Sequence, residues 1–169
     1  MASISAVAAV ALTPGARRPN TPSIRRSRTS CASVGTNGSH SSEPALSGNF
    51  MPSGITPMIS IIRWILTKNI DAELFLIVAN KTEADIIFRH EWERNVQEHP
   101  NFHCHHVLEQ PPPEWSGSIG RVTPEILRQH LPAADTATCI FLCGPPPMVD
   151  ALETTLKELG YPGQAIILP

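Results

Sequence analysis

Two short stretches of the sequence carry residue types that could bind a flat, phosphate-bearing ligand. In "FLCGPPPM", residues 141–148, an apolar run ends at Cys143 and is followed by Gly144 and three prolines. Gly144 removes a side chain where a flat ring could approach, and Pro145 to Pro147 stiffen the turn into a helix. Cys143 would then hold its sulfur towards the crevice as an active-site thiol. The alternative is that Cys143 is a small buried hydrophobic residue, the usual state of a free cysteine.

The second stretch is "SGITPM", residues 53–58, in which a glycine precedes a Thr-Pro pair. Gly54 allows close approach of the backbone. A helix that begins near Thr56 and Pro57 turns N–H groups and the positive end of its dipole outward. Such helix starts are typical of sites that hold a phosphate group, so the stretch predicts a phosphate site.

Alternating strands and helices surround both stretches. Long apolar runs predict strands covered on both faces, and segments of helical period with Thr-Pro starts or Pro and Gly stops predict helices. We expect helices over 56–68, 86–99, 123–131 and 147–160, and strands over 74–80, 102–108, 138–144 and 165–168. This order predicts a doubly wound α/β domain with a parallel sheet, in which ligands lie beyond the carboxyl ends of the strands.

Four separated motifs resemble the pyridine-nucleotide domain of the NADH-cytochrome b5 reductase family and of the related nitrate reductase module. The resemblance spans residues 51–169, which we take as an NAD-binding oxidoreductase domain. Members of this family pass a hydride from NADH to FAD and then pass electrons singly to a heme protein. The motifs occur in the family's order: "GITPM" (54–58), "ANKTEADII" (79–87), the segment with Glu114, Trp115 and Gly120, and "CGPPPM" (143–148).

The resemblance implies a place for each site residue in an NADH complex. A carboxylate such as Glu109 near the ribose favours the 2′-hydroxyl of NADH and repels the 2′-phosphate of NADPH, so we expect a preference for NADH. The implied positions are Gly54, Thr56 and Pro57 at the pyrophosphate, Asn80 and Glu109 facing the adenosine half, and Cys143, Gly144 and Pro145 beside the nicotinamide, with Cys143 as the catalytic residue and Met148 in the same cofactor site.

The sequence departs from the family before the first motif. Residues 51–57 read Met-Pro-Ser-Gly-Ile-Thr-Pro where the family usually has Gly-Gly-Thr-Gly-Ile-Thr-Pro. Pro52 has no N–H to offer a phosphate. The preceding "EPALSGNF" (43–50) reads as coil where the family has a buried strand. We therefore expect the first strand of the fold to be degraded or missing.

The flavin-binding signature of the family, Arg-x-Tyr-Ser/Thr, has no counterpart, since the only tyrosine is Tyr161 in a Gly-Tyr-Pro context. We expect a cytochrome b5 reductase-like enzyme that is incomplete without an FAD domain and that has a flavoprotein or heme protein as its partner. The alternative is a truncated form that binds a nucleotide or a partner protein without catalysis. A third interpretation is an alternative transcript without a stable product.

Residues 1–50 form a separate compositional region. Residues 1–42 contain no Asp or Glu and are rich in Arg, Ser, Thr, Ala and Pro. This bias predicts a disordered tail and is typical of presequences that target a mitochondrion or plastid. Without such targeting, a cytosolic protein is expected, because the four cysteines match no disulfide or zinc framework. A tail without function is the alternative.

Charge and hydropathy exclude several classes of partner. The formal net charge is −2 and no predicted face carries a basic stripe, so a nucleic-acid partner is not expected. No apolar run approaches the roughly 20 residues that a transmembrane helix needs.

Two further features allow more than one interpretation. "HCHH" (103–106) contains zinc-ligand types, but on a strand His103 and His105 point to one face and Cys104 and His106 to the other, so we expect no metal there. Trp115 lies in a proline-rich loop and is either a lid beside the adenine or a plug over the sheet edge.

Overall fold

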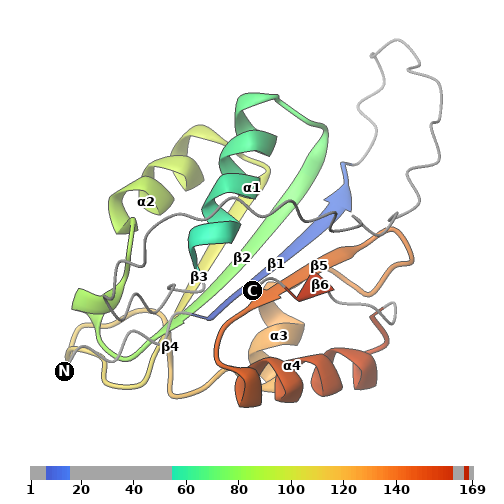
Figure 1. The fold of residues 1–169 in the computed structure, drawn as a ribbon. Helices are drawn as coiled ribbons and strands as arrows, with labels where there is room; N and C mark the ends of the chain where they lie inside the picture. Colours follow the sequence, from blue (N-terminus) through green and yellow to red (C-terminus); the bar gives the residue numbers. More distant parts are fainter. Residues whose placement is uncertain (1–6, 16–54, 162–165, 168–169) are drawn as a thin grey trace, which may run out of the picture. The chain divides into compact units, whose positions relative to one another are not determined.

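The structure, a computed structural model, describes residues 7–15, 55–161 and 166–167, which form a sheet with helices on both faces (Figure 1). The sheet has the strand order β4-β3-β2-β1-β5-β6. All neighbouring pairs are parallel except those of β1, which runs antiparallel to both β2 and β5. The strands are β1 (Val7–Pro14), β2 (Ala72–Asn80), β3 (Phe102–Leu108), β4 (Ser118–Ile119), β5 (Cys139–Cys143) and β6 (Ile166–Ile167).

The central strand β1 comes from the N-terminal region of the chain, and Figure 1 shows it between β2 and β5. Val10 is paired with Leu76 on one side and with Phe141 on the other. Val10 and Ala11 are fully buried, and they point into the cores on opposite faces of the sheet. A short run of small apolar residues therefore occupies the most buried position in the sheet.

The composition of residues 1–50 predicts a disordered tail, whereas the structure includes Val7–Pro14 in the sheet. The mixed α/β class is confirmed, but the sheet is parallel only outside its centre. Residues 43–50, where we expected a degraded first strand, lie outside the described residues. The domain boundary at residue 50 and the organelle-targeting function stay predictions.

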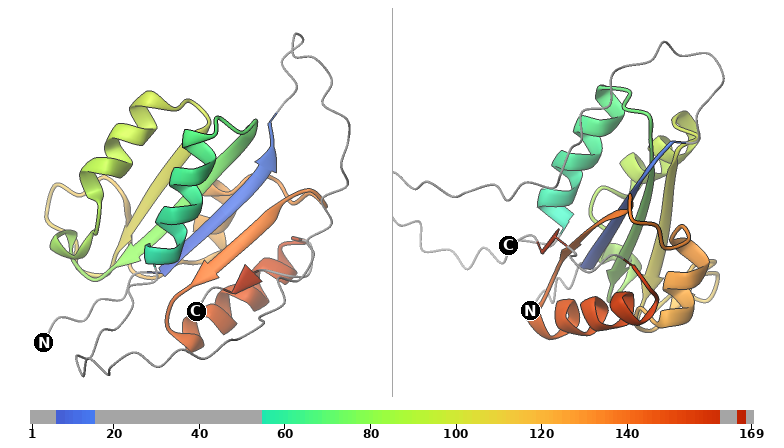
Figure 2. Two further views of the ribbon diagram at one scale, coloured as in Figure 1. Left: turned by 45° about the horizontal axis from the view of Figure 1, so that its top comes forward. Right: turned by 90° about the vertical axis from the view of Figure 1, so that its right-hand side faces the viewer.

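The helices cover the two faces of the sheet in pairs, as Figure 2 shows. Helices α1 and α2 pack on the face that holds Val10, Leu76 and Val78, and α3 and α4 pack on the face that holds Ala11 and Leu142. The amphipathic pattern predicted from the sequence is therefore confirmed. The helices are α1 (Ile55–Thr67), the 3-10 helix η1 (Glu83–Asp85), α2 (Arg89–Glu98), α3 (Pro124–His130) and α4 (Pro146–Glu158).

A side-chain cap and a left-handed residue explain where α3 and α2 begin. The Thr123 side chain accepts a hydrogen bond from the Ile126 N–H, and Pro124 occupies the first turn of α3, as the Thr-Pro pair predicts. Helix α2 begins at Arg89, later than expected, because Phe88 has φ 60° in the left-handed region. The residues before it form η1, which brings Glu83 towards the carboxyl edge of the sheet.

Candidate functional site

The carboxyl ends of β2, β3 and β5 meet at one edge of the sheet. Strand β2 is parallel to β3, and both β2 and β5 are antiparallel to β1, so the three strands point the same way. Asn80 ends β2, Cys143 ends β5, and Glu109 directly follows β3. The expected arrangement of these three positions at one edge is therefore present.

A cavity of about 350 Å³ opens between the end of β3 and helix α4, and we call it the β3–α4 cavity. Three residues that the sequence analysis placed in the cofactor site line it together: Glu109, Pro145 and Met148. Its wall is mostly apolar, which suits the flat face of a base or a sugar ring. The remaining lining residues, which sequence reasoning missed, are Arg121, Val122, Pro147, Ala151, Leu152 and Thr155.

Strand β4 brings Arg121 to this cavity. The Gly120 N–H donates to the Leu108 carbonyl at 2.8 Å, and Leu108 is paired with Ile119 in the parallel β3–β4 ladder. Gly120 has φ 93°, a left-handed conformation that strains other residues and that turns the chain away after β4. The next residue, Arg121, lines the same cavity as Glu109. The sequence signal was Gly120 itself, although β4 is too short to be recognised by its pattern.

The first turn of α4 offers no main-chain donor to a ligand. Pro146 and Pro147 have no N–H. The N–H groups of Met148 and Val149 both donate to the Pro145 carbonyl, at 2.9 and 3.1 Å. Pro145 and Pro147 thus present apolar rings to the β3–α4 cavity, and phosphate binding by this helix start is not supported.

Asn80 plays a structural role at the end of β2. It is 3% exposed, and its side-chain N–H₂ donates to the Asp85 carbonyl at 2.9 Å, which fastens η1 to the strand. Its Oδ1 atom is buried without a hydrogen-bond partner within the described residues. The Asn80 carbonyl also accepts from the Glu109 N–H at 3.1 Å. Asn80 therefore fixes the backbone from which Glu109 projects.

Cys143 is 4% exposed and packs in the core cluster of α1 and α2. Burial raises the pKa of the Cys143 thiol above its ordinary value, so the thiol is protonated at neutral pH. Gly144, which follows it, is partly exposed at the edge. Of the two interpretations in the sequence analysis, the buried environment agrees with a packing residue, and the catalytic role stays a prediction.

Helix α1 starts at the same edge as the β3–α4 cavity. It leads into β2 and therefore runs against the strand direction, and its first residue, Ile55, packs in the same cluster as Cys143. Thr56 is exposed in the first turn, and Pro57 is partly exposed. Gly54, the remaining residue of the expected phosphate site, lies outside the described residues.

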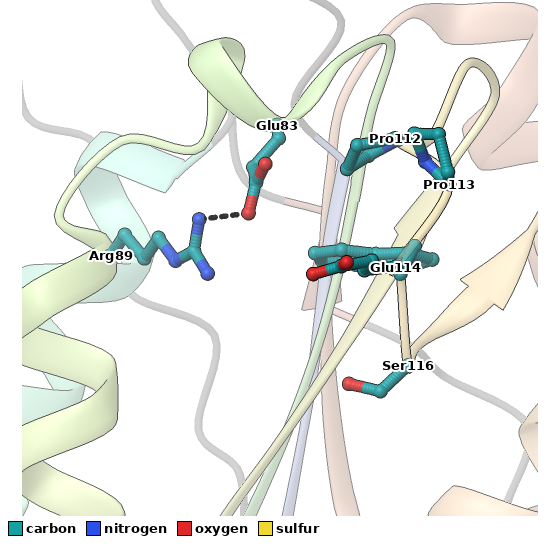
Figure 3. Close-up of a pocket in the computed structure, with 7 residues that line it drawn as sticks. Glu83, Arg89, Pro112, Pro113, Glu114 and Ser116 are labelled. Atoms are coloured by element: carbon teal, nitrogen blue, oxygen red, sulfur yellow. Dashed lines mark hydrogen bonds and ion pairs between the residues drawn. The ribbon is translucent and has the colours of Figure 1, made fainter.

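A second cavity, of about 460 Å³, lies on the other side of the loop after β3, and we call it the Trp115 cavity. In Figure 3, Glu83 and Arg89 form an ion pair on one side, and Pro112, Pro113, Glu114 and Ser116 lie opposite. The Trp115 indole N–H donates to the Ser118 carbonyl at 3.1 Å, and the ring lies edge-on to His106. Trp115 is not among the residues that line the β3–α4 cavity, which favours the plug over the adenine lid.

The "HCHH" strand alternates as expected. The His105 ring stacks on His130 of α3 with centroids 3.4 Å apart, whereas Cys104 packs in the cluster of α1 and α2. Burial, and to a lesser extent the neighbours His130 and His106, lower the pKa of His105 to about 4. Within the described ranges, no three His, Cys, Asp or Glu side chains gather in a way that could hold a metal ion.

Among the described residues, no helix has the length and hydropathy that spanning a membrane requires.

Comparison with known proteins identifies the domain type. A family model described as "Oxidoreductase NAD-binding domain" matches residues 53–154. NADH-cytochrome b5 reductase 1 of Meyerozyma guilliermondii is 45% identical over 112 residues, which are 65% of this chain and 39% of the relative. The corresponding protein of Neosartorya fischeri is 40% identical over 115 residues, 64% of this chain and 37% of the relative. The chain thus spans less than two fifths of the length of these relatives.

Solved structures show the same fold. The cytochrome b5 reductase domain of Ulva prolifera nitrate reductase superposes with a TM-score of 0.66 at 32% identity, covering 69% of this chain and 46% of that one. The CS-b5R domains of human Ncb5or, in the NAD⁺ form, superpose with a TM-score of 0.59 over 69% of this chain and 34% of that one. The second similarity, at 24% identity, supports the fold alone.

Proposed function

This chain belongs to the oxidoreductase NAD-binding domain family, and on that premise we propose that it is the NADH-binding part of a cytochrome b5 reductase-type electron-transfer protein. The observation that carries the proposal is the β3–α4 cavity, where Glu109, Pro145 and Met148 come together from two separate elements. The residues present fit a nucleoside, because an apolar wall faces a carboxylate that has no ion pair among the described side chains.

Each group in the cavity would bind one part of the nucleotide. The Glu109 carboxylate would accept hydrogen bonds from ribose hydroxyls, and charge-assisted hydrogen bonds of this kind are the stronger ones. The rings of Pro145 and Pro147 and the thioether of Met148 would cover an apolar face of the ligand. The exposed start of α1, at Thr56, would receive the pyrophosphate through its dipole.

The nicotinamide would lie where β5 ends. Gly144 leaves room beside the end of the strand, and the buried Cys143 fixes the wall behind it. A nicotinamide bound there would supply a hydride to a flavin held by another domain. The chain's own residues would hold the donor and exclude water, and Cys143 would act through position rather than as a thiolate.

The electron acceptors would be bound by other domains or proteins. The family match at residues 53–154 concerns the NAD-binding domain, and the named relatives are NADH-cytochrome b5 reductases. We propose that FAD is held by a separate flavin domain and that a heme protein is the final electron acceptor.

A titration of the full chain with NADH, followed by fluorescence, tests the binding step. We expect saturable binding by the wild type and by Glu114→Gln, a control variant in the Trp115 cavity. Reduction of ferricyanide by NADH should be slow in the chain alone and should rise when a flavin domain is added. A chain that unfolds cooperatively but shows no saturable NADH binding would contradict the proposal.

A further inference from the structure

One side chain of the β3–α4 cavity, Arg121, carries a positive charge that no ion pair among the described residues neutralises. Arg121 lines this cavity, is exposed and has no ion pair within the described residues. The other arginines of residues 55–161 each pair with a glutamate within 4.0 Å, namely Arg63, Arg89, Arg94 and Arg128. Glu109, which lines the same cavity, likewise has no ion pair in that part of the chain.

The backbone keeps the two charges at neighbouring strand ends. Glu109 is anchored through its N–H to the Asn80 carbonyl, and Gly120 is anchored through its N–H to the Leu108 carbonyl, at 3.1 and 2.8 Å. The same cavity therefore presents a carboxylate and a guanidinium, each on hydrogen-bonded backbone. Neither side chain is bound to the other at ion-pair distance, so both are available to a ligand.

The rest of the cavity offers little to a phosphate group. Main-chain donors are lacking in the first turn of α4, because the N–H groups of Met148 and Val149 are used by the Pro145 carbonyl. The Thr155 hydroxyl donates to the Ala151 carbonyl at 2.9 Å. Among the lining residues, Arg121 alone carries a positive charge. A phosphate that enters this cavity would therefore bind through the guanidinium, whose planar fork matches phosphate oxygens.

We propose that Arg121 is a specificity-determining residue that allows the cavity to accept a 2′-phosphorylated adenosine ribose. A carboxylate near the ribose rejects the 2′-phosphate of NADPH, whereas a nearby arginine accommodates it. Glu109 therefore sets a preference for NADH, and Arg121 limits that preference by compensating the repulsion. The proposal rests on the proposed nucleotide-binding function and goes beyond it by assigning the cavity a measurable affinity for NADPH.

The test uses the full chain and two probes without a nicotinamide, ADP-ribose and its 2′-phosphate derivative. We expect Arg121→Ala to weaken binding of the 2′-phosphate probe about tenfold or more and of ADP-ribose less than about twofold, the size of effect for one charged contact. Arg121→Lys should restore part of the lost affinity. Arg128→Ala, an exposed arginine of α3 outside the cavity, should change neither affinity.

The outcomes separate this proposal from the proposed function. Equal weakening of both probes by Arg121→Ala would mean that the guanidinium stacks on the base, and would overturn the proposal. The proposal would also be overturned if Arg121→Ala left both dissociation constants unchanged. If the folded wild type binds neither probe, the proposed nucleotide-binding function is wrong, and so is the proposed role of Arg121. Glu109→Gln should shift the ratio in the opposite direction, in favour of the 2′-phosphate probe.

Discussion

The centre of the sheet and its carboxyl edge have opposite chemical character. At the centre, β1 contributes alanine, valine and leucine side chains, and Val10 and Ala11 are fully buried between two layers of helices. At the edge, the β3–α4 cavity is bordered by Glu109 and Arg121, which are exposed and carry charges without ion pairs in the described part of the chain. Backbone hydrogen bonds to β2 and β5 and apolar packing hold the central strand in place. At the edge, the two charged side chains take part in neither kind of interaction.

This difference implies that the centre of the sheet determines the stability of the domain, whereas the edge determines what it binds. Strand pairing ends at Leu108 and Cys143, and the groups proposed to bind nucleotide lie at or beyond those ends. Changes at the centre should therefore reduce the free energy of unfolding and affect binding only through unfolding. Changes at the edge should alter binding and leave the unfolding transition in place.

A charge in the central strand should have the largest effect. Val10→Asp places a carboxylate at a fully buried position between β2 and β5, with no partner. We expect a loss of at least about 4 kcal/mol in the free energy of unfolding, enough to unfold much of a domain of ordinary stability. Urea unfolding followed by circular dichroism measures this loss.

The matched control introduces the same charge at the end of the same strand. Pro14 is exposed, so Pro14→Asp should change stability by no more than about 0.5 kcal/mol. If Val10→Asp were as stable as Pro14→Asp, β1 would not occupy the centre of the sheet in solution.

Removing the charge of an edge residue should have an intermediate effect, and this effect should be confined to nucleotide binding. Glu109→Gln keeps the shape of the side chain but weakens the hydrogen bonds that ribose hydroxyls would donate to it. We expect the dissociation constant for NADH to rise about tenfold, equivalent to about 1.4 kcal/mol. Stability should be unaffected, and a parallel drop in the urea midpoint would show that centre and edge are coupled.

The smallest effect concerns the pH dependence of stability. The pKa of His105 is about 4 in the folded chain, against an ordinary value of 6.5, mainly because of burial. Below about pH 6.5 the unfolded chain binds a proton that the folded chain does not, so stability falls as the pH falls, and levels off below about pH 4. After allowance for solvent screening, we expect a contribution of about 1 kcal/mol or less.

Urea unfolding of His105→Phe between pH 7 and about pH 4 measures how much His105 contributes to the pH dependence of stability. The phenyl ring preserves the stacking on His130 but cannot titrate, so the slope of stability against pH should decrease. Burial also lowers the pKa of His106, and a residual slope is therefore expected. His90→Gln, at a position 99% exposed, should leave the slope unchanged. An unaltered slope in His105→Phe would remove His105 from the acid response.

Elements with a local signal were predictable from the sequence. Strand β3 has the predicted bounds, and α3 follows from its Thr-Pro start, because both are determined by neighbouring residues. The partial site of Glu109, Pro145 and Met148 was predictable because strand ends in this type of sheet meet at one edge.

Elements that depend on distant partners were not predictable. Val7–Pro14 has the composition of a targeting segment, and nothing within it signals that β2 and β5 lie on either side. Arg121 lies in no pattern, and only the short β3–β4 pairing brings it to the cavity. The position of Asn80 at the end of β2 was predicted correctly. The inward turn of its side chain was not, because it depends on the hydrogen bond that the side chain donates to the Asp85 carbonyl in η1.

The pairing of β1 has a consequence for folding during synthesis. Val7–Pro14 is translated well before its second partner, β5, which begins only at Cys139. At about 5–20 residues per second, this apolar segment must remain unpaired on one side for several seconds or more. Contacts so distant in sequence also slow folding. A nascent chain that pauses before Cys139 would expose an open strand edge, which chaperones and other nascent chains can bind.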